Sequence, residues 1–263
     1  MEAAPAGSLT VLVEACVDAI DAALEAERGG AGRIELCGEL LQGGVTPSAG
    51  LIGAVRDRLA IPVFVLIRPR TGDFLYSDDE RDVMRRDIAL AKSFGAHGVV
   101  IGALTRAGDV DDELTRMLID IARPMDVTFH RAFDFARDQD AAMDALLEAG
   151  VDRLLTSGGA PTAREGAVAL ARLVRRADRK MTILAGGSIT SGNAAEVVRV
   201  SGVSEIHVRA ALRASSAMEH RRAGVSLARA ASPDDYERMV TRSDEIARIV
   251  AASRTMLRCS PEL

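Results

Sequence analysis

Two acid–thiol pairs stand near the start of the chain, in the segments Glu14-Ala15-Cys16 and Glu35-Leu36-Cys37. Both segments resemble short apolar β-strands, in which residues two apart share a face, so each strand would point one carboxylate and one thiol the same way. If the strands are neighbours, Cys16 and Cys37 come close enough to share a soft metal ion, and thiolates favour Cu(I) or Zn(II). The alternative is that both cysteines are small buried core residues, a common environment for a neutral thiol.

Arginines follow the third apolar run of the chain, in the segment Arg68-Pro69-Arg70-Thr71-Gly72-Asp73. Guanidinium groups grip carboxylate and phosphate groups with paired hydrogen bonds, so we expect Arg68, Arg70 and Asp73 to contact an anionic ligand. An ion pair between Arg70 and Asp73 within the loop is the alternative.

Two histidines stand at the ends of later apolar runs. His130, which is followed by Arg131 and Asp134, could be a general base, a metal ligand or a core histidine, and its charged neighbours favour a role in a site. His207 ends the eighth run, and we expect it to contact the anionic ligand together with Arg131 and Asp134. The loop Gly186-Gly187-Ser188 after the seventh run offers bare backbone amides for a phosphate, or serves only as a tight turn.

Short β-branched runs alternate with longer amphipathic stretches along the whole chain. The pattern predicts eight strands, which begin near Leu9, Arg33, Pro62, Gly98, Asp126, Asp152, Met181 and Ser204. Between them it predicts helices such as 18–28, 48–59, 79–94, 141–149 and 192–200. Eight strand–helix units favour a single (β/α)8 TIM barrel over residues 8–255 rather than an open doubly wound sheet. We also expect a C-terminal helical extension and flexible termini at 1–7 and 256–263.

Capping residues mark several expected helix boundaries. Thr46-Pro47, Ser77-Asp78-Asp79-Glu80 and Thr162-Ala163-Arg164-Glu165 are typical of helix starts. Ser232-Pro233-Asp234-Asp235 would open the helix of the C-terminal extension. Glycines that would end helices in a left-handed conformation are Gly29, Gly95, Gly150 and Gly202.

Strand parity sorts the polar residues, because an unpaired charge buried against the helical layer would be very costly. We therefore expect charged strand residues to face the lumen of the barrel, near the C-terminal ends of the strands where the sites of such barrels lie. The side chains expected to point inward are those of Glu14, Cys16, Glu35, Cys37, Phe64, Leu66, Arg68, Thr128, His130, Glu205 and His207.

Composition narrows the classes of function. The 263 residues are 48% hydrophobic with a net charge of −5, and the lack of a basic block or an aromatic ladder disfavours nucleic-acid binding. No apolar run approaches the ~20 residues that span a bilayer, so no membrane partner is expected, and the start lacks a secretion signal. Three cysteines, an odd number, favour a reducing cytosol over a disulfide framework.

Taken together, several motifs resemble the CutC copper homeostasis proteins. They are Glu14-Ala15-Cys16, Gly30-Ala31-Gly32-Arg33-Ile34-Glu35-Leu36-Cys37, Gly43-Gly44-Val45-Thr46-Pro47-Ser48, Ile67-Arg68-Pro69-Arg70, Gly72-Asp73-Phe74-Leu75-Tyr76-Ser77, Val127-Thr128-Phe129-His130-Arg131-Ala132-Phe133-Asp134 and Leu155-Thr156-Ser157-Gly158. The resemblance implies a cytosolic (β/α)8 barrel, often oligomeric, that is linked to copper tolerance. In the animal members, paired cysteines are proposed to hold Cu(I), and the matching positions are Cys16 and Cys37.

The chain departs from the family pattern at two places. Ser188 stands third in a loop that often reads as three glycines, and Val208-Arg209 follows His207 where the family tends to carry smaller residues. The second departure could add an anion contact or close the pocket.

Two functions from different classes follow. The first is a cytoplasmic copper homeostasis protein, a homo-oligomer that binds Cu(I) through Cys16 and Cys37. The second is a TIM-barrel enzyme that acts on a small anionic or phosphorylated metabolite, with Glu14, Glu35 and His130 exchanging protons. A non-catalytic interaction scaffold is a third possibility, which the polar lumen disfavours.

Overall fold

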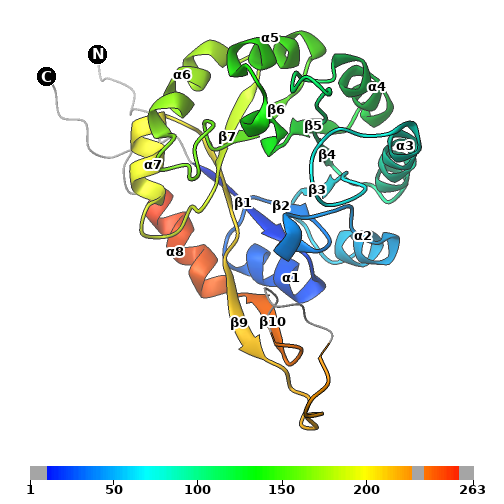
Figure 1. Ribbon diagram of the computed structural model, residues 1–263. Coiled ribbons are helices and arrows are strands. Elements are labelled where there is room, and N and C mark those ends of the chain that lie inside the picture. The colour runs from blue at the N-terminus through cyan, green and yellow to red at the C-terminus, as the bar shows by residue number, and fades with distance from the viewer. Residues whose placement is uncertain (1–10, 227–233, 255–263) are drawn as a thin grey trace, which may run out of the picture.

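The computed structural model describes residues 11–226 and 234–254 of the chain, and these form a closed parallel barrel wrapped by helices (Figure 1). Each strand pairs with the next along the chain, and β8 pairs with β1 to close the cylinder. The predicted (β/α)8 TIM barrel is therefore confirmed. The barrel strands are β1 Leu12–Val17, β2 Arg33–Leu36, β3 Val63–Leu66, β4 Gly98–Ile101, β5 Asp126–Phe129, β6 Arg153–Thr156, β7 Thr182–Gly186 and β8 Glu205–Val208.

Seven helices connect successive strands and cover the outside of the barrel, and an eighth follows the last unit. They are α1 Ile20–Arg28, α2 Ala49–Arg56, α3 Asp78–Ser93, α4 Asp112–Ala122, α5 Gln139–Ala149, α6 Ala167–Ala177, α7 Ala194–Ser201 and α8 Ser243–Arg254. Two short 3-10 turns, η1 Leu40–Gln42 and η2 Arg131–Phe135, follow β2 and β5 at the C-terminal mouth of the barrel. None of the helices within 11–226 and 234–254 is long and apolar enough to cross a bilayer.

The helix starts agree with the sequence only in part. Ser77 and Glu80 form the expected capping box of α3. The prediction for Thr46-Pro47 is wrong: Ser48 caps α2, because the hydroxyl of Thr46 accepts a hydrogen bond from the Arg68 backbone N–H instead. Thr162 does accept from the Glu165 N–H, but this turn lies before α6 rather than opening it.

The glycine ends of helices are confirmed at Gly95, Gly150 and Gly202, which have φ between 71° and 76°. Gly29 is the exception, because it stays right-handed with φ −75° and Gly30 takes the left-handed conformation instead. Position 29 has no room for a side chain, because a Cβ there would lie 2.5 Å from Cβ of Ile246 in α8.

The C-terminal extension differs from the sequence prediction. The expected helix is present as α8 but begins only at Ser243. Before it, an antiparallel hairpin of β9 Ala211–Ser215 and β10 Glu237–Thr241, which was not predicted, projects beyond the barrel (Figure 1). Asp234 forms a turn by accepting from the Tyr236 and Glu237 N–H groups, and this local bonding competes with a helix start. Ser232, Pro233 and the predicted flexible termini, 1–7 and 256–263, lie outside the described residues.

The strand faces follow the predicted parity. Val13, Ala15, Ile34 and Leu36 belong to the large apolar core between the strands and the helices. A separate small cluster fills the centre of the barrel and consists of Cys16, Cys37, Leu40, Phe64, Leu66 and Val100. The alternation therefore delivers the thiols to the lumen, as the i, i+2 pattern requires.

Candidate functional site

A buried network of ion pairs occupies the N-terminal half of the lumen. Arg33, the first residue of β2, pairs with Glu14 and lies 2.5 Å from Glu205, and Arg153 of β6 donates to Glu205 at 2.8 Å. Both guanidinium groups lie about 5 Å from the ring centre of Phe64, at 5.0 and 5.1 Å. The two arginines compensate the charges that the sequence places in the lumen.

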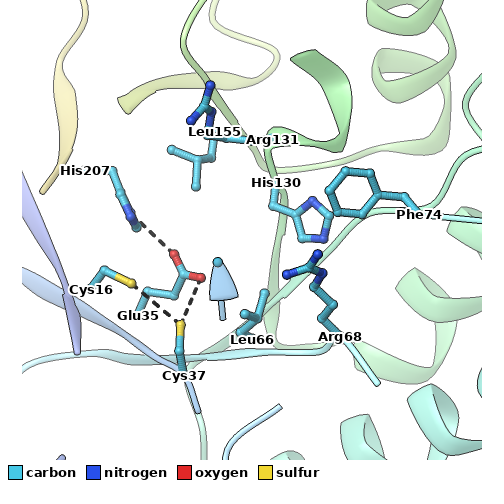
Figure 2. Close-up of a pocket in the computed structure, with 11 residues that line it drawn as sticks. Cys16, Glu35, Cys37, Leu66, Arg68, Phe74, His130, Arg131, Leu155 and His207 are labelled. Atoms are coloured by element: carbon cyan, nitrogen blue, oxygen red, sulfur yellow. Dashed lines mark hydrogen bonds and ion pairs between the residues drawn. The ribbon is translucent and has the colours of Figure 1, made fainter. Parts of the chain in front are cut away.

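Above this network, the two thiols meet a carboxyl group and an imidazole from three neighbouring strands (Figure 2). The sulfurs of Cys16 and Cys37 are 3.6 Å apart, and the Cys37 thiol lies 3.4 Å from Oε1 of Glu35. His207 Nδ1 is 2.8 Å from Oε1 of Glu14 and 3.3 Å from Oε2 of Glu35. The structure thus brings together five of the residues that the sequence singles out.

The pair formed by His207 and Glu14 carries full charges. Burial alone would raise the pKa of Glu14, but the charge of Arg33 and the hydrogen bond from His207 bring it down to about 2. Burial alone would lower the pKa of His207, but hydrogen bonds to Cys16 and Glu14 and the charge of Glu35 raise it well above its usual range. His207 is therefore an imidazolium, oriented by an ionised Glu14.

The two thiols differ in their readiness to ionise. The hydrogen bond from Cys37 is the main reason that the pKa of Cys16 falls to about 6, and His207 contributes to the shift. Burial, together with the adjacent Cys16, raises the pKa of Cys37 well above its usual range. Burial and the charge of Cys16 also raise the pKa of Glu35 to about 8. At neutral pH the cluster therefore holds one thiolate, one thiol and one protonated carboxyl group.

On the opposite wall, Arg68 and His130 stand beside Phe74 (Figure 2). His130 Nδ1 accepts a hydrogen bond from the Ala132 N–H at 3.1 Å, so the neutral imidazole carries its proton on Nε2. Burial, and then the charge of Arg68, lower the pKa of His130 to about 3. His130 is therefore an uncharged hydrogen-bond donor at neutral pH rather than a base.

Between these two walls lies a cavity of about 140 Å³. It is lined by Cys16, Glu35, Cys37, Gly43, Leu66, Arg68, Phe74, His130, Arg131, Leu155 and His207. Arg209, one of the departures from the family pattern, donates to the Leu40 carbonyl at 3.0 Å and so ties the end of β8 to η1 at the mouth.

Four of the predicted anion-binding residues are engaged in bonds within the mouth loops. Arg70 donates to Glu80 and Asp73 at 2.6 and 3.0 Å, and does not line the cavity. Asp134 accepts from Arg131 at 2.7 Å, and also from the Ser157 N–H, so it joins η2 to the end of β6. The ion pair between Arg70 and Asp73, which was the alternative in the sequence analysis, is therefore present. Ligand binding by these four residues stays a prediction.

The glycine loop after β7 packs against its neighbours rather than lining the cavity. A Cβ on Gly186 would lie 2.5 Å from Leu155, and the Gly187 carbonyl accepts from the Ala163 N–H. Ser188 has φ 55°, and its carbonyl accepts from the side chain of Asn193. Close packing explains the small residues here, and phosphate binding by Gly186, Gly187 and Ser188 stays a prediction.

Sequence reasoning misses several residues of the site. Arg33 and Arg153 escape attention because each is the first residue of its strand, although Arg33 shares parity with Glu35 and could have been found that way. Phe74 and Leu155 come from loop and strand positions with no polar pattern to mark them.

The ionisation of Cys16 can be measured directly. In a Cys259→Ser background, alkylation of Cys16 by iodoacetamide should follow pH with a midpoint of about 6. Cys37→Ala removes the main cause of the shift, so the midpoint should rise and the rate at pH 6 should fall about tenfold or more. Mass spectrometry of the alkylated peptide gives the rate. Identical midpoints in the two proteins would contradict the assigned hydrogen bond.

Comparisons with known proteins identify the relatives of this chain. The model of the CutC family matches residues 11–212. Copper homeostasis protein cutC homologs from Homo sapiens and Mus musculus are 45% and 44% identical over 246 residues, which cover 94% of this chain and 90% of each relative. A "family protein CutC" from Chromobacterium violaceum is 44% identical over 89% of this chain and 95% of its own length.

Solved structures extend the comparison to three dimensions. The crystal structure of a CutC protein from Streptococcus agalactiae is similar with a TM-score of 0.72 and 31% identity, and covers 75% of this chain and 97% of its own. Phosphoribosylanthranilate isomerase from Thermotoga maritima has a TM-score of 0.57 at 14% identity over 93% and 98% of the two chains, a likeness of fold alone. Because the family model covers most of the barrel and the relatives match over nearly the whole chain, this chain belongs to the CutC family.

Proposed function

We propose that this chain takes part in copper homeostasis by holding Cu(I) between Cys16 and Cys37 in the cytosol. The observation that carries the proposal is the pair of free, buried thiols whose sulfurs lie 3.6 Å apart inside the barrel. A first-row metal–thiolate bond is about 2.3 Å long, so two sulfurs at this separation can both contact one ion. Soft thiolate ligands favour Cu(I) over the harder cations of the cell.

The charge state of the cluster supports the proposal. Metals bind thiolates rather than thiols, and Cys16 with its pKa of about 6 is mostly ionised at neutral pH. Cys37 would release its proton to solvent when the ion binds, because Glu35, 3.4 Å from its sulfur, already holds a proton at neutral pH. The imidazolium of His207 stabilises the anionic cluster beside it.

A third ligand is available without rearrangement of the strands. Ligand atoms of Cys16, Glu35 and Cys37 all lie within 4.8 Å of one another, as do those of Glu14, Glu35 and His207. Glu35 belongs to both groups, and its Oε2 makes no hydrogen bond among the described residues, although His207 Nδ1 lies 3.3 Å away. The first group carries the softer donors, so we assign Cu(I) to it, with His207, 3.3 Å from Glu35 Oε2, as the neighbour that orients Glu35.

Titration with Cu(I) under a competing chelator tests the site. Altering a group that merely supports a metal ligand costs about 10–100-fold in affinity, so removing both sulfurs in Cys16→Ser/Cys37→Ser should cost more than about 100-fold. Cys259→Ser is the matched control and should retain the affinity of the wild type. Equal affinities in the double variant and the control would reject the site, provided that circular dichroism shows both proteins folded.

One observation favours the alternative function, an enzyme that acts on a small anionic metabolite. Burial raises the pKa of Glu35 to about 8, which suits a proton donor at neutral pH. His130 is less suited to its predicted role as a base, because burial keeps it neutral with the proton on Nε2. Turnover by this chain therefore stays a prediction, as does assembly into a homo-oligomer.

A further inference from the structure

Arg68 differs from the other buried arginines of the described chain. Three arginines of the described chain are less than 9% exposed, namely Arg33, Arg68 and Arg153. Arg33 and Arg153 both pair with Glu205. Arg68 has no carboxylate within 4 Å among residues 11–226 and 234–254. A buried charge without a counter-ion is costly, so this position calls for an anion from outside the chain.

The hydrogen bonds of Arg68 fix the direction of its remaining donor. Its two Nη atoms donate to the carbonyls of Gln42, Gly44 and Gly72, at 3.4, 2.8 and 2.6 Å. These neutral acceptors hold the guanidinium plane in place between two mouth loops. The Nε–H has no partner in the described structure, although the side chain lines the cavity.

A second unpaired donor stands beside the first. His130 Nε2 is buried and has no partner among the described residues, and its Nδ1 is already used by the Ala132 N–H. Both groups contact the same ring, with Phe74 5.2 Å from the Arg68 guanidinium carbon and 5.0 Å from the imidazole centre. Figure 2 shows the imidazole and the guanidinium next to each other on one wall. Gly102 leaves room for this placement, since a Cβ there would lie 2.3 Å from the His130 ring.

We propose that the cavity binds a short monocarboxylic acid, whose carboxylate accepts from Arg68 Nε and His130 Nε2. The charge matches a single negative ion, because His130 is neutral and the other cation on this wall, Arg131, is already paired with Asp134 at 2.7 Å. A dianionic phosphate would leave one charge uncompensated. The two donors to the carboxylate stand on the wall opposite the thiol pair, which lines the same cavity, and neither donor belongs to the proposed Cu(I) site.

The size and walls of the cavity define the rest of the ligand. Its volume of about 140 Å³ is close to that of an engineered apolar cavity of about 150 Å³ that holds benzene, so about six heavy atoms fit. Leu66, Leu155 and Phe74 supply apolar walls for a chain of three or four carbons. A second cavity of about 650 Å³ shares Gly43, Arg68, Phe74 and Arg131 with it, and gives the ligand a way in from the surface.

The far wall offers a partner for one more oxygen. Glu35 lines the cavity from the side of the thiols, and its Oε2 lies 3.3 Å from His207 Nδ1 without forming a hydrogen bond in the described chain. A hydroxyl group on the carbon next to the carboxylate, as in lactate, would point toward that oxygen. Short hydroxy acids therefore fit better than simple fatty acids of equal length, and lactate is the natural probe.

Calorimetric titration of the apo protein with lactate, lactamide and inorganic phosphate tests the proposal. Lactate should bind in the millimolar range, whereas its neutral amide and phosphate should bind at least about tenfold more weakly, since a hydrogen bond to a charged group contributes about 1.5–3 kcal/mol. Equal binding of lactamide would overturn the carboxylate assignment. Tighter binding of phosphate, or no heat with lactate at tens of millimolar, would also overturn the proposal.

Two variants and a control locate the binding site. His130→Asn keeps an oxygen that can accept from the Ala132 N–H but removes the Nε2 donor, and Arg68→Lys keeps the charge but removes the Nε donor. Each should weaken lactate binding about tenfold or more. Arg116→Gln, at an exposed ion pair of α4 outside the cavity, should leave it within about twofold of the wild type. If Arg68→Lys fails to fold, His130→Asn is the deciding test. Unchanged lactate binding in His130→Asn would reject the proposed carboxylate site. Unchanged Cu(I) affinity in His130→Asn would show that the thiol site is intact.

Discussion

Arg33→Met is expected to lower the free energy of unfolding by about 3–5 kcal/mol, the usual cost of removing one partner from a buried ion pair. Arg33 is 3% exposed and compensates two carboxylates, Glu14 and Glu205, which are themselves inside the barrel. Met fills a similar volume but leaves Glu14 with only His207 and Glu205 with only Arg153 as a cationic partner. The loss also removes the charge that holds the pKa of Glu14 at about 2, so Glu14 becomes easier to protonate.

Urea denaturation followed by circular dichroism measures the effect of Arg33→Met. Arg248→Met is the matched control, because Arg248 pairs with Glu245 and Asp244 on the exposed face of α8 and such surface pairs contribute little to stability. Similar losses in the two variants would mean that the lumen network is no more important for stability than a surface pair.

The sign of the pH dependence provides a second check on Arg33→Met. The folded pKa of Glu14 lies below its unfolded value of 4.5, so its contribution to stability is present above that value and disappears as the pH falls toward 2. Without Arg33, the ionised Glu14 contributes less to the free energy of unfolding. The difference in stability between the two proteins should therefore be largest at neutral pH and should narrow as the solution is acidified.

The alternation of side chains made the barrel and its thiol pair predictable. Strict parity in β1 and β2 places Cys16 and Cys37 on the lumen side, and the parallel register puts Cys16 directly beside Glu35. Eight repeated strand–helix units leave few other ways to bury the apolar faces. Fold and cluster therefore follow from local rules that act on each strand separately.

The partners of the buried charges could not be predicted, because they depend on which side chains of non-adjacent strands reach across the lumen. Arg153 of β6 meets Glu205 of β8 from across β7. Loop conformation decides the environment of Arg68 in the same way, since its three carbonyl partners come from two loops without a recognisable pattern. The C-terminal hairpin was missed because its two strands are separated by residues 216–236.

Gly98→Ala is expected to destabilise the barrel by about 1–3 kcal/mol, although alanine is normally the better-tolerated residue. A Cβ at the start of β4 would lie 2.5–2.7 Å from three carbons of the Phe64 ring. The ring cannot easily move away, because Arg33 and Arg153 stand 5.0 and 5.1 Å from its centre and are themselves fixed by ion pairs. The clash therefore reaches the charge network as well as the aromatic ring.

Urea denaturation measures the stability of Gly98→Ala, and Gly50→Ala is its control with the opposite expected effect. Gly50 lies in α2 with no atom within 4 Å of its added Cβ, so alanine there should stabilise the protein by about 0.5–1 kcal/mol through helix propensity and a less flexible unfolded chain. Phe64→Leu in the Gly98→Ala background should recover part of the loss, because a smaller side chain makes room for the methyl group. If Gly98→Ala proved as stabilising as Gly50→Ala, the phenyl ring of Phe64 would have to be mobile. Arg33 and Arg153 could then not be held rigidly against that ring. Opposite signs at the two glycines would instead show that Phe64 fills the lumen tightly enough to support the thiol cluster above it.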